Sequence, residues 1–275
     1  MKMNKRNPVC SAPLWLIIIF MVFTQAGAAA EQAAKEERFN GHHFSYGISL
    51  CHDQAREDLL VPFRWAGVGV GIPVAWSFVG EILTVGTELK LALSYLEERY
   101  GNGGFIATPE FLFEWYGRIW ERGPLDFALG AVLRFRINDE ELFSWDDAHL
   151  YYLASHMIGP EAVLEWDRLN KSILYLRLGL PFIGFVGRPE EKRFVKQELG
   201  SVGVYFTEPN RNLEFATLPD YTSFELAIGI TRLLRRSALK LEYVLDFERY
   251  SEPVPFARLT NSIMFSHDIK LGRQK

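Results

Sequence analysis

Apolar and polar residues alternate over long stretches of this chain. In the segment from Leu125 to Ile137 every second residue is apolar, and Arg134 and Arg136 fall between the apolar positions. Alternate residues of a β-strand face opposite sides, so this segment is predicted to be a strand with one apolar face. In a soluble protein the arginines would face water. In an outer-membrane barrel the apolar residues face lipid and the arginines face the lumen.

Nine further segments alternate in the same way. They begin at His43, Arg64, Glu81, Gly104, Pro160, Ser172, Ser223, Ala238 and Arg258. The pattern therefore predicts ten strands, and a short candidate over residues 200–206 would raise the number to twelve if it had a partner. Several segments run about 13–16 residues, compared with about 5–6 for a common strand. Such lengths suit strands that cross a bilayer at a tilt.

The predicted connections alternate in length. Short links fall near residues 77–80, 120–124, 168–171 and 233–236, and the longest predicted link covers residues 138–159. Short periplasmic turns and long outer loops are typical of outer-membrane barrels. Tryptophans near segment ends, such as Trp65 and Trp76, suit the membrane interfaces. We predict an all-β fold, a closed antiparallel transmembrane β-barrel of about ten strands, with both of its ends periplasmic.

The N-terminus has the features of a secretory signal peptide. Lys2, Lys5 and Arg6 precede an apolar run over residues 12–23, and small residues follow it. That run is shorter than the roughly 20 residues of a spanning helix, which argues against a membrane anchor. We predict a signal peptide over residues 1–30, a polar periplasmic leader over 31–42 and a single β-barrel domain over 43–275.

Composition excludes some functions. The full chain has a net charge of −4, and the predicted signal peptide carries three positive charges, so the mature chain has about −7. A nucleic-acid-binding protein needs a cluster of basic residues, so this negative charge argues against a nucleic-acid partner. Cys51 is the one cysteine after the predicted signal peptide, so we expect no intrachain disulfide.

The alternation from His43 to Leu271, together with the predicted signal peptide, resembles Gram-negative outer-membrane β-barrel proteins as a broad class. The resemblance implies an outer-membrane location, with outer-membrane lipid and the barrel-assembly machinery as partners. Such barrels usually end in an aromatic residue, whereas this chain ends DIKLGRQK. This departure suggests either a last strand that ends near Phe265 or a weaker assembly signal.

The polar face of the predicted strands carries many charges, which we expect to line the lumen. These residues are Glu88, Lys90, Glu110, Glu114, Arg118, Asp126, Arg134, Arg136, Arg177, Glu225, Lys240, Glu242, Asp246 and Glu248. A barrel of about eight to ten strands is narrow, so charges of both signs are expected to pair across it. The sequence therefore predicts a small, porin-like channel that admits small solutes, or a structural barrel with a charge-lined lumen.

Alternative functions lack a diagnostic motif. The pair His43 and Ser45 resembles the His-x-Ser of outer-membrane deacylases and phospholipases, but Tyr46 stands where the pattern continues with Asn. Asp146, Asp147, His149 and His156 cluster in the longest predicted link, as in outer-membrane proteases, without a distinctive spacing. No cofactor motif or standard metal-ligand spacing is present. A soluble periplasmic β-barrel that binds an apolar ligand is the alternative fold.

Overall fold

The structure is a computed structural model. It describes residues 40–57, 63–141, 149–169, 171–188, 194–195, 208–210, 213–234, 237–251 and 255–271. The predicted signal peptide and the strand candidate over residues 200–206 lie outside the described residues. No helix among the described residues is long and apolar enough to cross a membrane.

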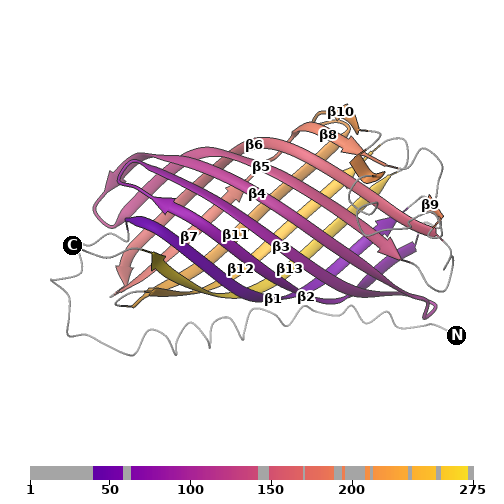
Figure 1. The fold of residues 1–275 in the computed structure, drawn as a ribbon, viewed down its shortest axis with the longest axis horizontal. Helices are drawn as coiled ribbons and strands as arrows, with labels where there is room; N and C mark the ends of the chain where they lie inside the picture. The colour runs from indigo at the N-terminus through magenta and orange to yellow at the C-terminus, as the bar shows by residue number, and fades with distance from the viewer. Residues whose placement is uncertain are drawn as a thin grey trace, which may run out of the picture. The chain divides into compact units, whose positions relative to one another are not determined.

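Ten antiparallel strands form a closed barrel (Figure 1). They are β1 (Gly41–Glu57), β2 (Phe63–Val79), β3 (Leu83–Glu98), β4 (Gly103–Arg122), β5 (Leu125–Glu141), β6 (His149–Leu169), β7 (Ser172–Gly179), β11 (Tyr221–Leu233), β12 (Ser237–Tyr250) and β13 (Phe256–Leu271). Pairing of β1 with β13 and of β7 with both β6 and β11 closes the ring. The predicted fold and the predicted ten strands are thereby confirmed.

Beyond β7, two short extra strands extend the same sheet. After Gly179 the chain passes through Pro181 into β8 (Ile183–Gly187), which pairs with β6 and with β10 (Leu213–Ala216). Leu180 and Phe182 still donate backbone hydrogen bonds to β6. Pro181 has no N–H to donate toward the other side, which is where the pairing with β11 ends. The strand predicted from Ser172 to Phe182 therefore ends earlier, at Gly179, and a separate strand, β8, follows it.

Two further segments complete the described secondary structure. The two-residue strand β9 (Phe194–Val195) pairs with the start of β6. The 3-10 helix η2 (Glu208–Asn210) precedes β10.

The longest predicted link is wrong in its extent. Strands β5 and β6 pair as far as Glu140 and Tyr151, so the link between them covers only residues 142–148. Leu153 and Met157 face the interior of this end of the barrel and are fully buried. Apolar residues therefore occupy both faces of β6 here, and the alternation that marks the other strands is lost.

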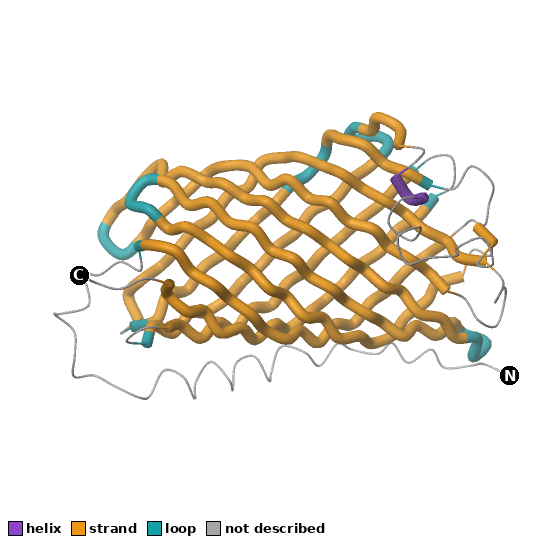
Figure 2. Tube along the Cα trace, in the orientation of Figure 1, coloured by secondary structure: helices purple, strands orange, loops and turns teal. Residues whose placement is uncertain are grey.

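Four links of two or three residues lie at one end of the barrel (Figure 2). They join β2 to β3, β4 to β5, β6 to β7 and β11 to β12. Gly123 and Lys171 in two of these turns have positive φ angles of 63° and 59°. His42 pairs with Leu271 at the same end, so the last strand does not stop near Phe265.

The apolar faces of the strands form the outside of the barrel. Leu129 is 47% exposed and Phe135 is 37% exposed, whereas Arg134 and Arg136 are only 2% and 3% exposed. The same holds around the ring, because large apolar side chains of β1, β2, β3 and β13 are exposed. A soluble barrel has the opposite arrangement, so this alternative is wrong.

One row of rings crosses five strands on this outer face. Phe111, Phe135, His156, Phe185 and Phe215 occupy paired positions on β4, β5, β6, β8 and β10. The centroids of neighbouring rings are 6.1 Å apart for Phe111 and Phe135, 5.0 Å for Phe135 and His156, and 5.8 Å for Phe185 and Phe215. His156 thus lies in a strand and faces outward, not in the loop where the sequence placed it.

Candidate functional site: the charged lumen

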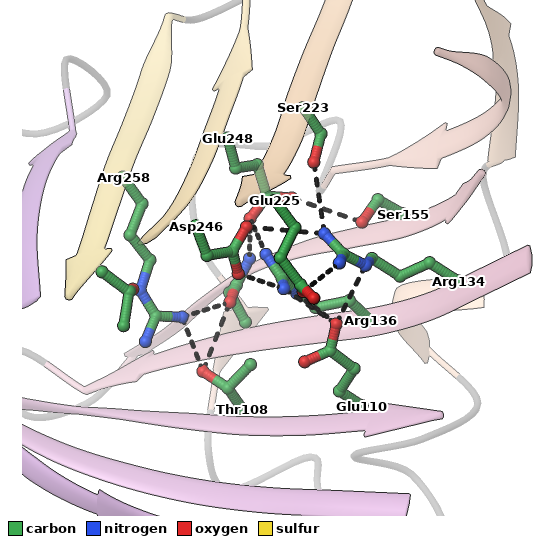
Figure 3. Close-up of polar contacts among 12 residues, drawn as sticks. Thr108, Glu110, Arg134, Arg136, Ser155, Ser223, Glu225, Asp246, Glu248 and Arg258 are labelled. Carbon is green, nitrogen blue, oxygen red and sulfur yellow. Dashed lines mark hydrogen bonds and ion pairs between the residues drawn. The ribbon is translucent and has the colours of Figure 1, made fainter. Parts of the chain in front are cut away.

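Two arginines of β5 form the centre of a buried ion-pair cluster (Figure 3). Arg136 donates to Glu110 of β4 over 2.8 Å, to Glu248 of β12 over 3.3 Å and to Asp246 of β12. Arg134 lies 3.1 Å from the same Glu110 and 3.4 Å from Asp246. We call these residues, together with Glu225, the arginine belt.

The arginine belt crosses the lumen. Strands β6, β7 and β11 separate β5 from β12 on one side of the ring, so side chains of β5 that reach β12 must pass through the interior. Arg134 also contacts Glu225 and Ser223 of β11. The cluster therefore connects facing walls of the barrel in its middle.

The carboxylate of Glu248 is fully enclosed by partners. It accepts hydrogen bonds from Tyr221 over 2.7 Å, Asn138 over 2.9 Å and Ser155 over 3.3 Å, besides the one from Arg136. Burial of an ion costs several kcal/mol unless its charge and hydrogen-bonding groups are satisfied. These contacts offset the free-energy cost of burying the charged Glu248 in the lumen.

A second cluster surrounds Arg177 of β7. Its guanidinium lies 2.8 Å from Glu225, 3.0 Å from Glu114 and 3.8 Å from Glu161. Glu225 also contacts Arg134, so this cluster is continuous with the arginine belt.

Two smaller pairs lie near the Arg177 cluster. Lys240 lies 2.9 Å from Glu242, which also accepts a hydrogen bond from Tyr175. Arg118 lies 3.9 Å from Asp126 nearer the short turns.

A third cluster was missed by the sequence analysis. Arg258 of β13 donates to Asp53 of β1 over 3.1 Å, to Thr108 of β4 over 2.7 Å and to Asn138 of β5 over 2.6 Å. Asp53 is fully buried and Arg258 is 5% exposed. The predicted first strand ends at Leu50, whereas β1 continues to Glu57. Extension of its alternation by three residues would have placed Asp53 on the inner face.

The structure brings most of the predicted lumen residues into these clusters. The arginine belt contains Glu110, Arg134, Arg136, Asp246 and Glu248. The cluster around Arg177 and the smaller pairs contain Glu114, Arg118, Asp126, Lys240 and Glu242. Glu88 and Lys90 lie on the inner face of β3 and form no ion pair with a described residue.

Apolar side chains fill the lumen at the end opposite the short turns. One buried cluster contains Leu153, Met157, Val186, Ala216, Tyr221, Tyr250 and Phe256. A second contains Ala55, Trp65, Leu96 and Ile106. Apolar side chains thus pack in the interior at this end, and ion pairs cross the interior in the middle.

A cavity of about 20 Å³, room for about one water molecule, remains beside the arginine belt. Its lining includes Glu110, Arg136 and Asp246 of the belt, Arg258 of the third cluster, and Lys90.

The candidate catalytic residues that the structure describes do not share one face, because His43 and Ser45 lie on the inner face of β1 and His156 lies on the outer face of β6. His43 is 1% exposed, faces the interior and lies 3.2 Å from Asp268. Ser45 shares that inner face, whereas the acyl chain of a lipid would approach from outside. Asp146 and Asp147 lie outside the described residues. No group of three His, Cys, Asp or Glu residues that could hold a metal occurs in the part of the chain that the structure describes.

No family model and no curated protein matches the sequence. Among solved structures, the chain is similar to the outer membrane protease OmpT from Escherichia coli, with a TM-score of 0.50 and 8% identity over 83% of this chain and 97% of that chain. It is also similar to the translocator domain of the autotransporter NalP from Neisseria meningitidis, with a TM-score of 0.46 and 7% identity over 94% of each chain. At such identities a likeness concerns the fold alone.

The fold and the apolar outer face define the class. An antiparallel barrel that is closed, apolar outside and charged inside is the architecture of outer-membrane β-barrel proteins. The chain is an outer-membrane β-barrel protein, as the alternation of its sequence predicted.

Proposed function

We propose that this protein is a small structural barrel of the outer membrane whose lumen is closed, and not an open pore. The arginine belt is the observation that carries this proposal. Arg134 and Arg136 extend from β5 and contact carboxylates on β4, β11 and β12. A barrel of about eight to ten strands has little room beyond its own side chains, so these contacts support a closed lumen.

Energetics favour the closed state. Each belt arginine is nearly fully buried and contacts at least three carboxylates. Separation of a buried pair leaves an uncompensated charge, at a cost of about 3–5 kcal/mol. Opening of the lumen would require several such separations at once, in addition to movement of the apolar clusters at the far end.

A small channel is the second candidate, and the charged side chains of the arginine belt favour it. Rings of charged side chains are the usual selectivity device of channels. In this case the arginine belt would be a constriction that opens to let small solutes cross.

Liposome swelling distinguishes these functions. The refolded protein is inserted into liposomes, and the entry of a small sugar such as arabinose is followed by light scattering. We expect the wild type to swell no faster than empty liposomes. The double variant Arg134→Ala/Arg136→Ala removes both crossing side chains and should admit the sugar, whereas Arg122→Ala, at the exposed end of β4, should not. Rapid swelling of wild-type liposomes would overturn the proposal and favour the channel.

A further inference from the structure

Three arginines lie in one line on the outer face of the barrel, at the end opposite the short turns. Strands β12, β13, β1 and β2 are neighbours in the sheet (Figure 1). Arg249 of β12 and Arg56 of β1 both pair with Ala257 of β13, and Arg56 also pairs with Arg64 of β2. All three arginine side chains are exposed. We call Arg249, Arg56 and Arg64 the outer arginine row.

The outer arginine row begins where the apolar band of the barrel ends. Arg249 follows Ser237, the first residue of β12 at the short-turn end, by twelve residues. At about 3.3 Å per residue and a tilt of about 40°, this stretch rises roughly 30 Å, about the thickness of the hydrocarbon core of a bilayer. Phe247, the next outward residue below Arg249, lies 5.5 Å from Phe224 between ring centroids, as in an interfacial girdle. Because the short turns of such barrels are periplasmic, the row lies among the head groups of the outer leaflet.

The positive charges of the row repel one another. Arg56 and Arg64 are directly opposite each other on neighbouring strands, and like charges in such a pair destabilise a sheet. Neither Arg64 nor Arg249 forms an ion pair with a described residue. Glu97 lies near the Arg64 end of the row and Asp220 near the Arg249 end, so acidic side chains flank the row and do not interrupt it. An anion from outside the chain would offset this repulsion.

Ala257 leaves space for such an anion between two arginines. Neighbouring strands are about 4.8 Å apart, so the backbones at Arg249 and Arg56 are roughly 10 Å apart, with a single methyl group between them. A phosphate group suits this space, because a guanidinium presents a planar fork of donors to its oxygens. Closer to the short turns, exposed Leu50 of β1 and Val68 of β2 offer acyl chains an apolar surface. The chemistry of this face therefore suits a lipid that carries a phosphate.

We propose that the outer arginine row binds a phosphate group of lipid A, the phosphorylated glycolipid of the Gram-negative outer leaflet, whose acyl chains lie along the apolar face below the row. The site is confined to one side of the barrel, since the outward positions at the same end of β5 carry Asp139 and Glu141. It lies on the outer face, so it is independent of the closed lumen proposed above.

Binding of lipid A to the refolded protein tests the site. The protein is kept in micelles of an uncharged detergent and titrated with lipid A that carries both of its phosphates, and native mass spectrometry counts the bound lipid. We expect Arg56→Gln, Arg64→Gln and Arg249→Gln each to weaken binding roughly fivefold, and the triple variant to weaken it about a hundredfold, from the contribution of one arginine near an anionic surface. Ala257→Glu should also weaken binding strongly, because it places a carboxylate between Arg249 and Arg56.

Arg122→Gln is the matched control, because Arg122 is an exposed arginine at the short-turn end of β4. Its removal should leave binding unchanged. Lipid A without its phosphates should bind the wild type as weakly as phosphorylated lipid A binds the triple variant. Inorganic phosphate should displace lipid A no more than sodium chloride of the same ionic strength does. Heat-dependent mobility on gels shows whether each variant is folded.

Three results would overturn the proposed site. They are unchanged binding of lipid A by the triple variant, equal binding of lipid A with and without its phosphates, and displacement of lipid A by inorganic phosphate beyond the effect of chloride. The last result would mean that the row binds free phosphate and not a lipid. Liposome swelling tests the closed lumen separately, so the two proposals can fail independently.

Discussion

Arg136 on β5 forms an ion pair with Asp246 on β12, although three strands of the ring lie between them. The same guanidinium lies 2.8 Å from Glu110 on β4. One side chain therefore links two walls of the barrel. Arg134 is the neighbouring residue of β5 on the inner face, and it contacts the same two carboxylates. Ion pairs therefore connect facing walls in the interior of this protein, whereas its outer face is apolar.

Removal of Arg136 is the first test of this arrangement. We expect Arg136→Met to lower the free energy of unfolding by about 3–5 kcal/mol, because Glu110 and Glu248 would stay buried with fewer partners. Guanidinium-induced unfolding in lipid vesicles measures this change. Arg122→Met, an exposed arginine at the short-turn end, is the control and should shift stability by less than about 0.5 kcal/mol. Equal effects of the two variants would mean that the belt contributes nothing specific.

Orientation of the strands has its own test. Leu129→Arg should lower the stability of the inserted barrel by about 2–4 kcal/mol, because Leu129 lies in the apolar outer face and arginine is costly at the bilayer midplane. Leu83→Arg introduces the same residue at the first position of β3, beside a short turn, where the cost falls to about 0–1 kcal/mol. Unfolding of both variants in vesicles measures the difference. If the two substitutions cost the same, Leu129 does not lie deeper in the bilayer than Leu83.

Two glycines differ in how closely their neighbours approach, so their substitution by alanine should change stability to different extents. Gly69→Ala should destabilise the barrel by about 1–3 kcal/mol, the usual cost of overpacking, since its Cβ would lie 2.6 Å from a backbone oxygen of β3 and 2.8 Å from the Cys51 sulfur. A Cβ at Gly117 would lie 3.8 Å from its nearest neighbour. Gly117→Ala should therefore be tolerated. Thermal unfolding monitored by circular dichroism compares them, and a neutral Gly69→Ala would refute the close approach.

Arg258 tests the cluster near Asp53. Arg258→Lys keeps the charge and removes the planar fork that serves Asp53, Thr108 and Asn138 together. We expect a loss of about 1–3 kcal/mol, because buried partners are left without their hydrogen bonds. Arg118→Lys, whose ion pairs are longer and partly exposed, should have little effect. A lysine that substitutes fully for Arg258 would show that charge alone matters there.

Much of the fold could be predicted from the sequence because lipid and lumen impose opposite chemistry on successive residues. Arg134 and Arg136 alternate with Leu133 and Phe135, and this pattern alone identifies both faces of β5. The pattern weakens where the inner face is apolar. Leu153 and Met157 pack inside the barrel, so the first half of β6 carried no alternation and was predicted to be a loop.

The partners inside the lumen could not be predicted in the same way. Alternation places Arg136 on the inner face, but it does not say which strand lies opposite or how far a guanidinium reaches. The contact with Asp246 depends on the register of every strand between them. Asp53 and Arg258 were missed because the ends of their strands were placed too early or their pattern was weak. The buried hydroxyl of Ser49 has no hydrogen-bond partner among the described residues, and a linear pattern does not reveal this.

Single-channel conductance of the refolded protein in a planar bilayer is the sharpest test of the closed lumen. A closed lumen predicts no discrete steps from wild-type protein that is shown to be inserted, and steps from the Arg134→Ala/Arg136→Ala variant at the same protein load. Reproducible steps from the wild type would contradict a closed lumen, because ions would then cross the arginine belt as it stands.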